Sequence, residues 1–137
     1  MASLVYFLLY NGSMLMTKTI LLIDDDPDEI DLFVDAMRTA GFDYVYGNES
    51  DAAGGLHSLT KILPDYILLD YNMPKMNGIE CLIKIKKTPH LSHIPVIMYS
   101  SVMDDDTIDA AMATGAAGCI KKPFDMRMLP SLLKPFL

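Results

Sequence analysis

The sequence predicts an α/β fold in which helices cover both faces of a parallel β-sheet. Two observations support this fold class. Short apolar runs of strand length alternate five times, from Lys18 onward, with segments whose apolar residues recur every three or four positions. Glycine and proline stand at many of the boundaries between them. Because crossovers between parallel strands are right-handed, the expected fold is doubly wound.

Five segments are predicted to be strands. The runs at 19–23, 66–69 and 96–99 are continuously apolar, which is typical of strands buried on both faces of a parallel sheet. The segments at 43–46 and 118–120 carry weaker signals.

Five segments are predicted to be helices, each with an apolar stripe at helical spacing. The stripes are Ile30, Phe33, Val34 and Met37; Ala52, Leu56, Leu59 and Leu63; Ile79, Leu82 and Ile83; Ile108, Ala111 and Met112; and Leu129, Leu132, Leu133 and Phe136. Pro130 lies early in the last helix, where only the first turn tolerates proline, so this helix is expected to be short or bent.

The first helix has clear end signals. Asp26 fits an N-cap, Pro27 the first helical position and Glu29 the third, which gives a capping-box pattern. Gly41 fits the position just after the helix. Asp26, Asp28 and Glu29 are therefore interpreted as a charged helix start with no further role.

Composition narrows the class of protein. The chain has 137 residues, 51% hydrophobic and 21% charged, which suits one domain with a real core at 18–137. Its net charge of −7 argues against a nucleic-acid partner, since phosphate binding needs clustered Lys and Arg. Cys81 and Cys119 do not form a metal-spaced set, and the cysteine usage is typical of a reducing cytoplasm.

Residues 1–17 form an N-terminal extension of uncertain status. Their apolar run is too short to span a membrane, and no basic residue precedes it as in a signal peptide. Three interpretations stay open: residues upstream of a true start at Met14 or Met16, an added hairpin at Asn11-Gly12, or an interaction segment.

Polar residues follow the carboxyl ends of four predicted strands. Asp24 and Asp25 follow the first strand, and Asp70 follows the third. Ser100 follows the fourth strand, and Lys122 the fifth. Because ligands of open α/β sheets bind at this edge, three carboxylates, a hydroxyl and an ammonium group are expected to meet at one site.

Such a site is suited to phosphoryl transfer. Two carboxylates about 4 Å apart repel by roughly 4 kcal/mol at an effective dielectric near 20, so three need a cation. Hard oxygen ligands without His or Cys suit Mg²⁺. Asp70 would be the nucleophile that becomes an acyl phosphate, while Lys122 neutralises the phosphoryl oxygens and Ser100 donates to one of them.

The chain resembles the receiver domain of two-component response regulators from about Lys18 to its end. The matching segments are "ILLIDDD", "YILLDYNMPKMNG", "IPVIMYSS" and "CIKKPF", in the family's order and spacing. The resemblance implies a flavodoxin-like, five-stranded sheet of order 2-1-3-4-5 flanked by five helices.

The resemblance also implies roles for the site residues. The Mg²⁺ ligands would be Asp25, Asp70 and the backbone carbonyl of Asn72, with Asp24 acting through water. Asp70 would be the phosphoacceptor, Ser100 the switch hydroxyl, and Lys122 the phosphate contact on a cis Lys-Pro bond. Cys119 occupies the position where the family commonly has an aromatic switch residue, so no aromatic can rotate there. It is interpreted as a small core residue in preference to a redox group.

The leading hypothesis is a stand-alone, single-domain response regulator, because too few residues follow Lys122 for an output domain. It would take a phosphoryl group from a sensor histidine kinase or histidine phosphotransfer protein and signal through altered binding of a downstream protein. No membrane partner is expected, and a homodimer is left open.

The first alternative is a Mg²⁺-dependent aspartyl-phosphate phosphatase of the haloacid-dehalogenase class. Those enzymes carry a second Asp two residues after the nucleophile, where this chain has Asn72. The second alternative is an unphosphorylated binding scaffold.

Overall fold

Five parallel strands form the single sheet of the computed structural model, which describes residues 17–137. They are β1 (Thr19–Ile23), β2 (Val45–Glu49), β3 (Tyr66–Leu69), β4 (Val96–Ser100) and β5 (Gly118–Lys121). Their order is β2-β1-β3-β4-β5, as the resemblance to receiver domains implies. The proposed extension at 1–17 lies outside the described residues except for residue 17.

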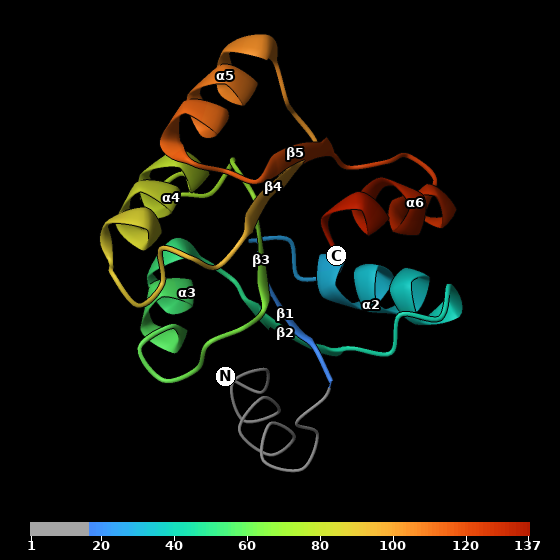
Figure 1. The fold of residues 1–137 in the computed structure, drawn as a ribbon. Coiled ribbons are helices and arrows are strands. Elements are labelled where there is room, and N and C mark those ends of the chain that lie inside the picture. Colours follow the sequence, from blue (N-terminus) through green and yellow to red (C-terminus); the bar gives the residue numbers. More distant parts are fainter. Residues whose placement is uncertain (1–16) are drawn as a thin grey trace.

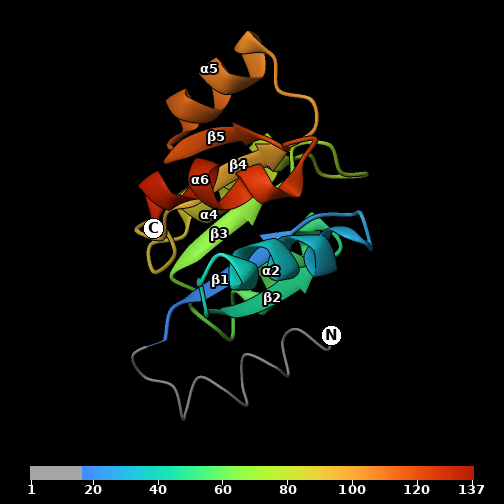
Figure 2. The same cartoon turned by 90° about the vertical axis from the view of Figure 1, so that its right-hand side faces the viewer.

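Helices cover both faces of the sheet (Figure 1). One face carries α3 (Ala52–Ser58), α4 (Gly78–Lys87) and α5 (Asp105–Thr114), and the other carries α2 (Glu29–Thr39) and α6 (Leu129–Leu133). The short 3₁₀ turns η1 (Met126–Met128) and η2 (Lys134–Phe136) flank α6. Figure 2 looks onto the face where α2 and α6 lie in front of the sheet. The predicted doubly wound α/β architecture is confirmed.

The central strands are apolar throughout because both of their faces are buried. Along β1, Leu21 and Ile23 join the core beneath α3, α4 and α5, whereas Ile20 and Leu22 join the core beneath α2 and α6. Side chains alternate between faces along a strand, so a strand covered on both sides cannot show a polar face. The polar residues of these strands are therefore found at their ends.

The second strand begins and ends later than predicted. β2 runs in parallel register with β1, from the pair Thr19–Val45 to the pair Ile23–Glu49. This register carries the strand through Gly47 and Asn48, which are poor strand formers. Pairing along the whole of β1 outweighs the local preference of the sequence.

The capping box predicted at the start of α2 is wrong. The helix begins at Glu29, and the side chain of Asp28 at the N-cap position makes no capping bond. The Asp26 carboxylate instead accepts from the Asp28 N–H at 3.0 Å, a local turn that competes with helix formation. The predicted helix end is confirmed, since Gly41 adopts a φ of 91° just beyond it.

The last helix is short, as Pro130 led us to expect. α6 has five residues, with Pro130 in its first turn and with Leu129 and Leu133 fully buried. The cis bond expected at Lys122-Pro123 is not present, because residues 17–137 contain no cis peptide bond. The trans isomer is intrinsically the more stable form of a bond preceding proline.

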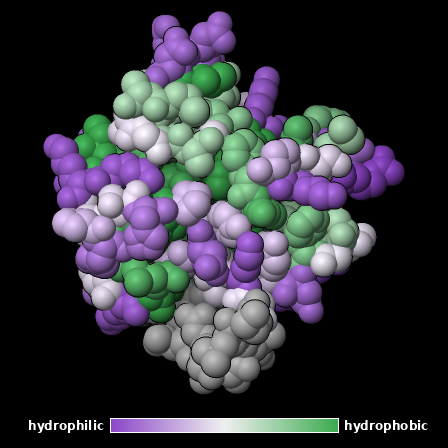
Figure 3. All heavy atoms as spheres, viewed as in Figure 1, coloured by the Kyte–Doolittle hydropathy of each residue, from purple (hydrophilic) through white to green (hydrophobic). Residues whose placement is uncertain are grey.

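The surface in Figure 3 shows hydrophilic residues over α3 and α4, at the tip of α5 and on the side of α2 and α6, whereas the lower part of α5 and the region toward β5 are more hydrophobic. Within the described part of the chain, none of the helices combines the length and apolar character needed to cross a membrane.

Candidate functional site

Three carboxylates meet where β1 and β3 end. Oxygen atoms of Asp24, Asp25 and Asp70 lie within 4.8 Å of one another. Asp24 and Asp70 are buried, with only 1% and 5% of their surfaces exposed, whereas Asp25 is exposed. The cluster is therefore open to solvent on one side only.

Backbone hydrogen bonds of the sheet fix the positions of the two buried acids. The Asp24 N–H donates to the Glu49 carbonyl at 3.0 Å, and the Asp70 N–H donates to the Ile23 carbonyl at 2.9 Å. The Asp24 carboxylate also accepts from the Asp26 N–H at 2.9 Å. The ladder thus continues one residue past each strand and holds the carboxylates at the sheet edge.

Lys122 places an ammonium group beside this cluster. Its backbone N–H donates to the Ser100 carbonyl at 2.8 Å, and its Nζ lies 2.6 Å from Asp24 Oδ2. Burial alone would lower the pKa of Lys122, but the Asp24, Asp70 and Glu29 carboxylates raise it above its usual value. Lys122 therefore stays charged at any physiological pH.

Ser100 is the last residue of β4 and is completely buried. Its hydroxyl makes no hydrogen bond of good geometry within residues 17–137, but the Asp70 carboxylate is a nearby acceptor whose pKa it lowers. This group is therefore placed to donate to Asp70 or to an anion that arrives beside it.

The ionisation of Asp70 reflects these surroundings. Burial is the main cause that raises the pKa of Asp70 to about 6, and the negative charge of Asp24 adds to it. Ser100, Lys122 and the backbone of Asn72 act in the opposite direction. Asp70 is consequently ionised at neutral pH, but its charge is poorly solvated.

The donor set of this cluster fits a hard divalent cation. The three acids offer only oxygen ligands, and Lys122 supplies too little positive charge to balance them. Asn72 lies exposed in the β3–α4 loop two residues after Asp70. Its backbone carbonyl is thus on the chain segment that leaves the cluster.

A tight backbone turn after Asp70 leads the chain away from the carboxylate. The Gly78 N–H donates to the Tyr71 carbonyl at 2.9 Å, and a Cβ at position 78 would collide with the Asp70 carbonyl oxygen. Asn77 and Glu80 form a capping box that begins α4 directly after this contact. Gly78 therefore allows the loop and the helix to follow the buried strand immediately.

The sequence interpretation missed two residues at the site, Glu29 and Tyr99. Glu29 Oε2 lies 3.7 Å from Lys122 Nζ, and the Tyr99 ring centroid lies 5.5 Å from the same atom. The interpretation of Glu29 as a solvated helix start is wrong, because its side chain is buried. A signal was available: Glu29 precedes the buried Phe33 and Met37 at intervals of four residues, so it lies on the buried face of α2.

Cys119 packs at the edge of the core beneath α3, α4 and α5 and is half-buried. Burial raises the pKa of its thiol, which disfavours the reactive thiolate. The packing supports the core interpretation over the redox one.

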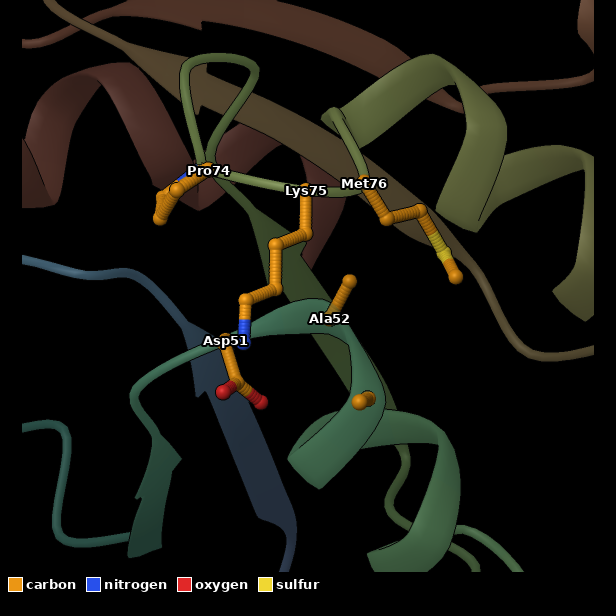
Figure 4. Close-up of a pocket in the computed structure, with 6 residues that line it drawn as sticks. Asp51, Ala52, Pro74, Lys75 and Met76 are labelled. Carbon is orange, nitrogen blue, oxygen red and sulfur yellow. The ribbon is translucent and has the colours of Figure 1, made fainter.

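A separate pocket of about 280 Å³ lies between the start of α3 and the β3–α4 loop (Figure 4). Lys75 extends across it toward Asp51, and Pro74 and Met76 also line it. Lys75 has a φ of 70°, which is unusual for a residue other than glycine. None of the predicted site residues lines this pocket, and nothing in its lining indicates a ligand.

Comparison with known proteins assigns the chain to a family. The model of the response regulator receiver domain matches residues 20–134. The chain therefore belongs to the receiver domain family of two-component systems, whose members act as signalling switches and not as classical enzymes.

Individual relatives agree with this assignment. The transcriptional regulatory protein CpxR homolog of Haemophilus influenzae is 36% identical over 120 residues, which cover 86% of this chain and 49% of that protein. Chemotaxis protein CheY-3 of Vibrio cholerae is 32% identical over 117 residues, which cover 83% of this chain and 87% of that protein. The solved structure of the phosphorylated cyanobacterial phytochrome response regulator RcpA is 27% identical, with a TM-score of 0.76, and the match covers 88% of this chain and 91% of that chain. This chain spans a quarter to about half the length of several curated relatives that it matches.

Proposed function

We propose that this receiver domain accepts a phosphoryl group on Asp70 from a phosphohistidine donor in a Mg²⁺-dependent reaction. The observation that carries the proposal is the cluster of three acids at the carboxyl edge of the sheet, with Lys122 beside it. RcpA, a relative of the same fold, has been crystallised in a phosphorylated form. That finding supports the proposal by analogy.

The transfer step makes one bond and breaks another. A carboxylate oxygen of Asp70 attacks the phosphorus atom of the phosphohistidine, and the P–N bond breaks with its electron pair passing to the imidazole nitrogen. Lys122 Nζ would turn from Asp24 toward the phosphoryl oxygens, and the Ser100 hydroxyl would donate to one of them. Asp70 ends as an acyl phosphate.

Mg²⁺ would supply the positive charge that offsets the acids and the phosphoryl oxygens. Asp25, Asp70 and the carbonyl of Asn72 would hold it, with Asp24 acting through water. A sensor histidine kinase or a histidine phosphotransfer protein would be the donor. The phosphorylated surface would then bind a downstream protein with altered affinity.

The phosphatase alternative has little support. It needs an acid/base group two residues after Asp70, and the amide of Asn72 cannot serve as one. The acyl phosphate should therefore persist for longer than one enzymatic turnover, which suits a signal.

Intact mass spectrometry tests this proposal. The protein is incubated with a small phosphoramidate or acyl-phosphate donor, with and without Mg²⁺, beside Asp70→Ala and the matched control Asp106→Ala on the exposed first turn of α5. We expect one added phosphoryl group that requires Mg²⁺, is absent from Asp70→Ala and is retained by the control. Continuous release of phosphate over many turnovers would favour the phosphatase, and absence of any adduct would favour a binding scaffold.

A further inference from the structure

Glu29 is a buried acid for which the phosphoryl-transfer step has no use. It opens α2 but faces inward, with 7% of its surface exposed. Its Oε1 atom is buried and makes no hydrogen bond of good geometry among residues 17–137, and the neutral hydroxyl of Tyr99 is the neighbouring donor. A buried carboxylate is costly in the interior unless an ion pair compensates it, so Glu29 requires a cation nearby.

That cation is Lys122. Its Nζ lies 3.7 Å from Glu29 Oε2 and 2.6 Å from Asp24 Oδ2. In the described part of the chain, the ion pairs of Lys122 within 4.0 Å are with these two acids, and Asp70 is not among them. The ammonium group is thus held on the α2 side of the site, away from the phosphoacceptor.

Tyr99 closes the same side of the site. Lys122 Nζ lies 5.5 Å from its ring centroid, and the ring packs edge-on against Phe33 of α2. Burial, and after it the negative charge of Glu29, raise the pKa of Tyr99 above its usual range, so its hydroxyl stays neutral. Tyr99 therefore cannot replace Glu29 as a counterion for the lysine.

We propose that Glu29 is a positioning residue that competes with the phosphoryl group on Asp70 for the ammonium group of Lys122. This inference rests on the proposed function. When a phosphoryl group arrives, Lys122 must leave a two-acid site, and Glu29 is left buried with a weakened ion pair. The cost of that separation lowers the affinity of the site for a phosphoryl group.

Glu29→Gln tests the inference, because it removes the charge and keeps the size of the side chain. The probe is beryllium trifluoride, a non-covalent mimic of a phosphoryl group, titrated at saturating Mg²⁺ and followed by ¹⁹F NMR. We expect the variant to bind the mimic on the order of tenfold more tightly than the unmodified protein. Calorimetric titration with Mg²⁺ alone should show weaker binding, since a negative charge has been lost.

Two further variants separate positioning from general effects. Glu49→Gln is the matched control: Glu49 is also buried but accepts from Ser58 Oγ at 2.7 Å, so neither titration should change. Glu29→Asp keeps the charge on a shorter side chain and should give an intermediate affinity. It also keeps the test available if the glutamine variant fails to fold.

The decisive comparison adds Lys122→Met. If Glu29 acts through the lysine, Glu29→Gln should no longer tighten binding of the mimic in the Lys122→Met background. A gain that persists there would overturn the inference, as would a Glu29→Gln variant that binds like the unmodified protein. Failure of the unmodified protein to bind the mimic with Mg²⁺ would instead overturn the proposed function, and the inference with it.

Discussion

Asp70 is a carboxyl group whose charge the folded protein disfavours. Its pKa rises from an ordinary value of 3.8 to about 6, mainly because the strand that carries it is buried. Between these two pH values the folded state binds more protons at this site than the unfolded state does. Folding stability should therefore fall as pH rises through this window and remain lower above it.

Asp70→Asn should accordingly stabilise the protein at neutral pH. Without a divalent cation, we expect a gain of about 1–2 kcal/mol in the free energy of unfolding at pH 7.5, allowing for partial solvent screening. At pH 3.5 the gain should vanish, because Asp70 is then protonated in the folded state. Urea unfolding at the two pH values measures the difference, and an equal effect at both would contradict the assigned cause.

At the scale of single residues, the sequence located the three clustered acids, Asp24 among them, but not Glu29, the second acid that pairs with Lys122. Asp24, Asp25 and Asp70 could be predicted because each directly follows a strand, and parallel strands end at one edge. Glu29 could not be placed by that rule, since it lies on a helix. Its burial depends on how α2 rests on the sheet, and it sits within an acidic run that is typical of a solvated helix start.

At the scale of elements, the turn from β3 into α4 leaves no room for a side chain at position 78, next to the site. A Cβ at position 78 would collide with the Asp70 carbonyl oxygen and lie 2.8 Å from Tyr71 Cα. Both neighbours are backbone atoms, which cannot move aside as the end of a flexible side chain can. Any side chain at this position must therefore shift Asp70 or the start of the helix.

Gly78→Ala should destabilise the protein by about 1–3 kcal/mol and weaken its phosphorylation. Thermal unfolding and the intact-mass assay measure the two effects. Gly54→Ala is the matched control, because a Cβ there meets only the side chains of Glu49 and Asp51. Equal behaviour of the two variants would show that the contact with Asp70 has no consequence.

Element boundaries show where sequence patterns are reliable. β1 and β3 match their predicted limits, since a continuous apolar run is needed to fill both cores. β2 and the start of α2 do not match. Pairing with β1 carries β2 through Gly47 and Asn48, and the turn at Asp26 delays the helix. These differences arise from strand pairing in the folded sheet and from competing side-chain hydrogen bonds. The apolar periodicity of the sequence reveals neither effect.

At the scale of the whole molecule, we expect the acidic cluster to couple stability to divalent cations. A cation that binds only the folded state stabilises it by about 2.7 kcal/mol when present at 100 times its Kd. We therefore expect Mg²⁺ to raise the Tm in a concentration-dependent manner, measured by calorimetry against NaCl of matched ionic strength. Asp25→Asn should reduce the rise, because Asp25 is the exposed acid of the cluster. An undiminished rise would place the cation elsewhere.

The order of the strands also has a consequence for the growing chain. During synthesis, β1 and β3 leave the ribosome long before β5, so the acids are made while Lys122 is still missing. A nascent domain that stops short of β5 holds Asp24 and Glu29 without their shared cation. The last strand thus closes the sheet and brings Lys122 to these acids in one event, so the site gains its ammonium group only once β5 has been made.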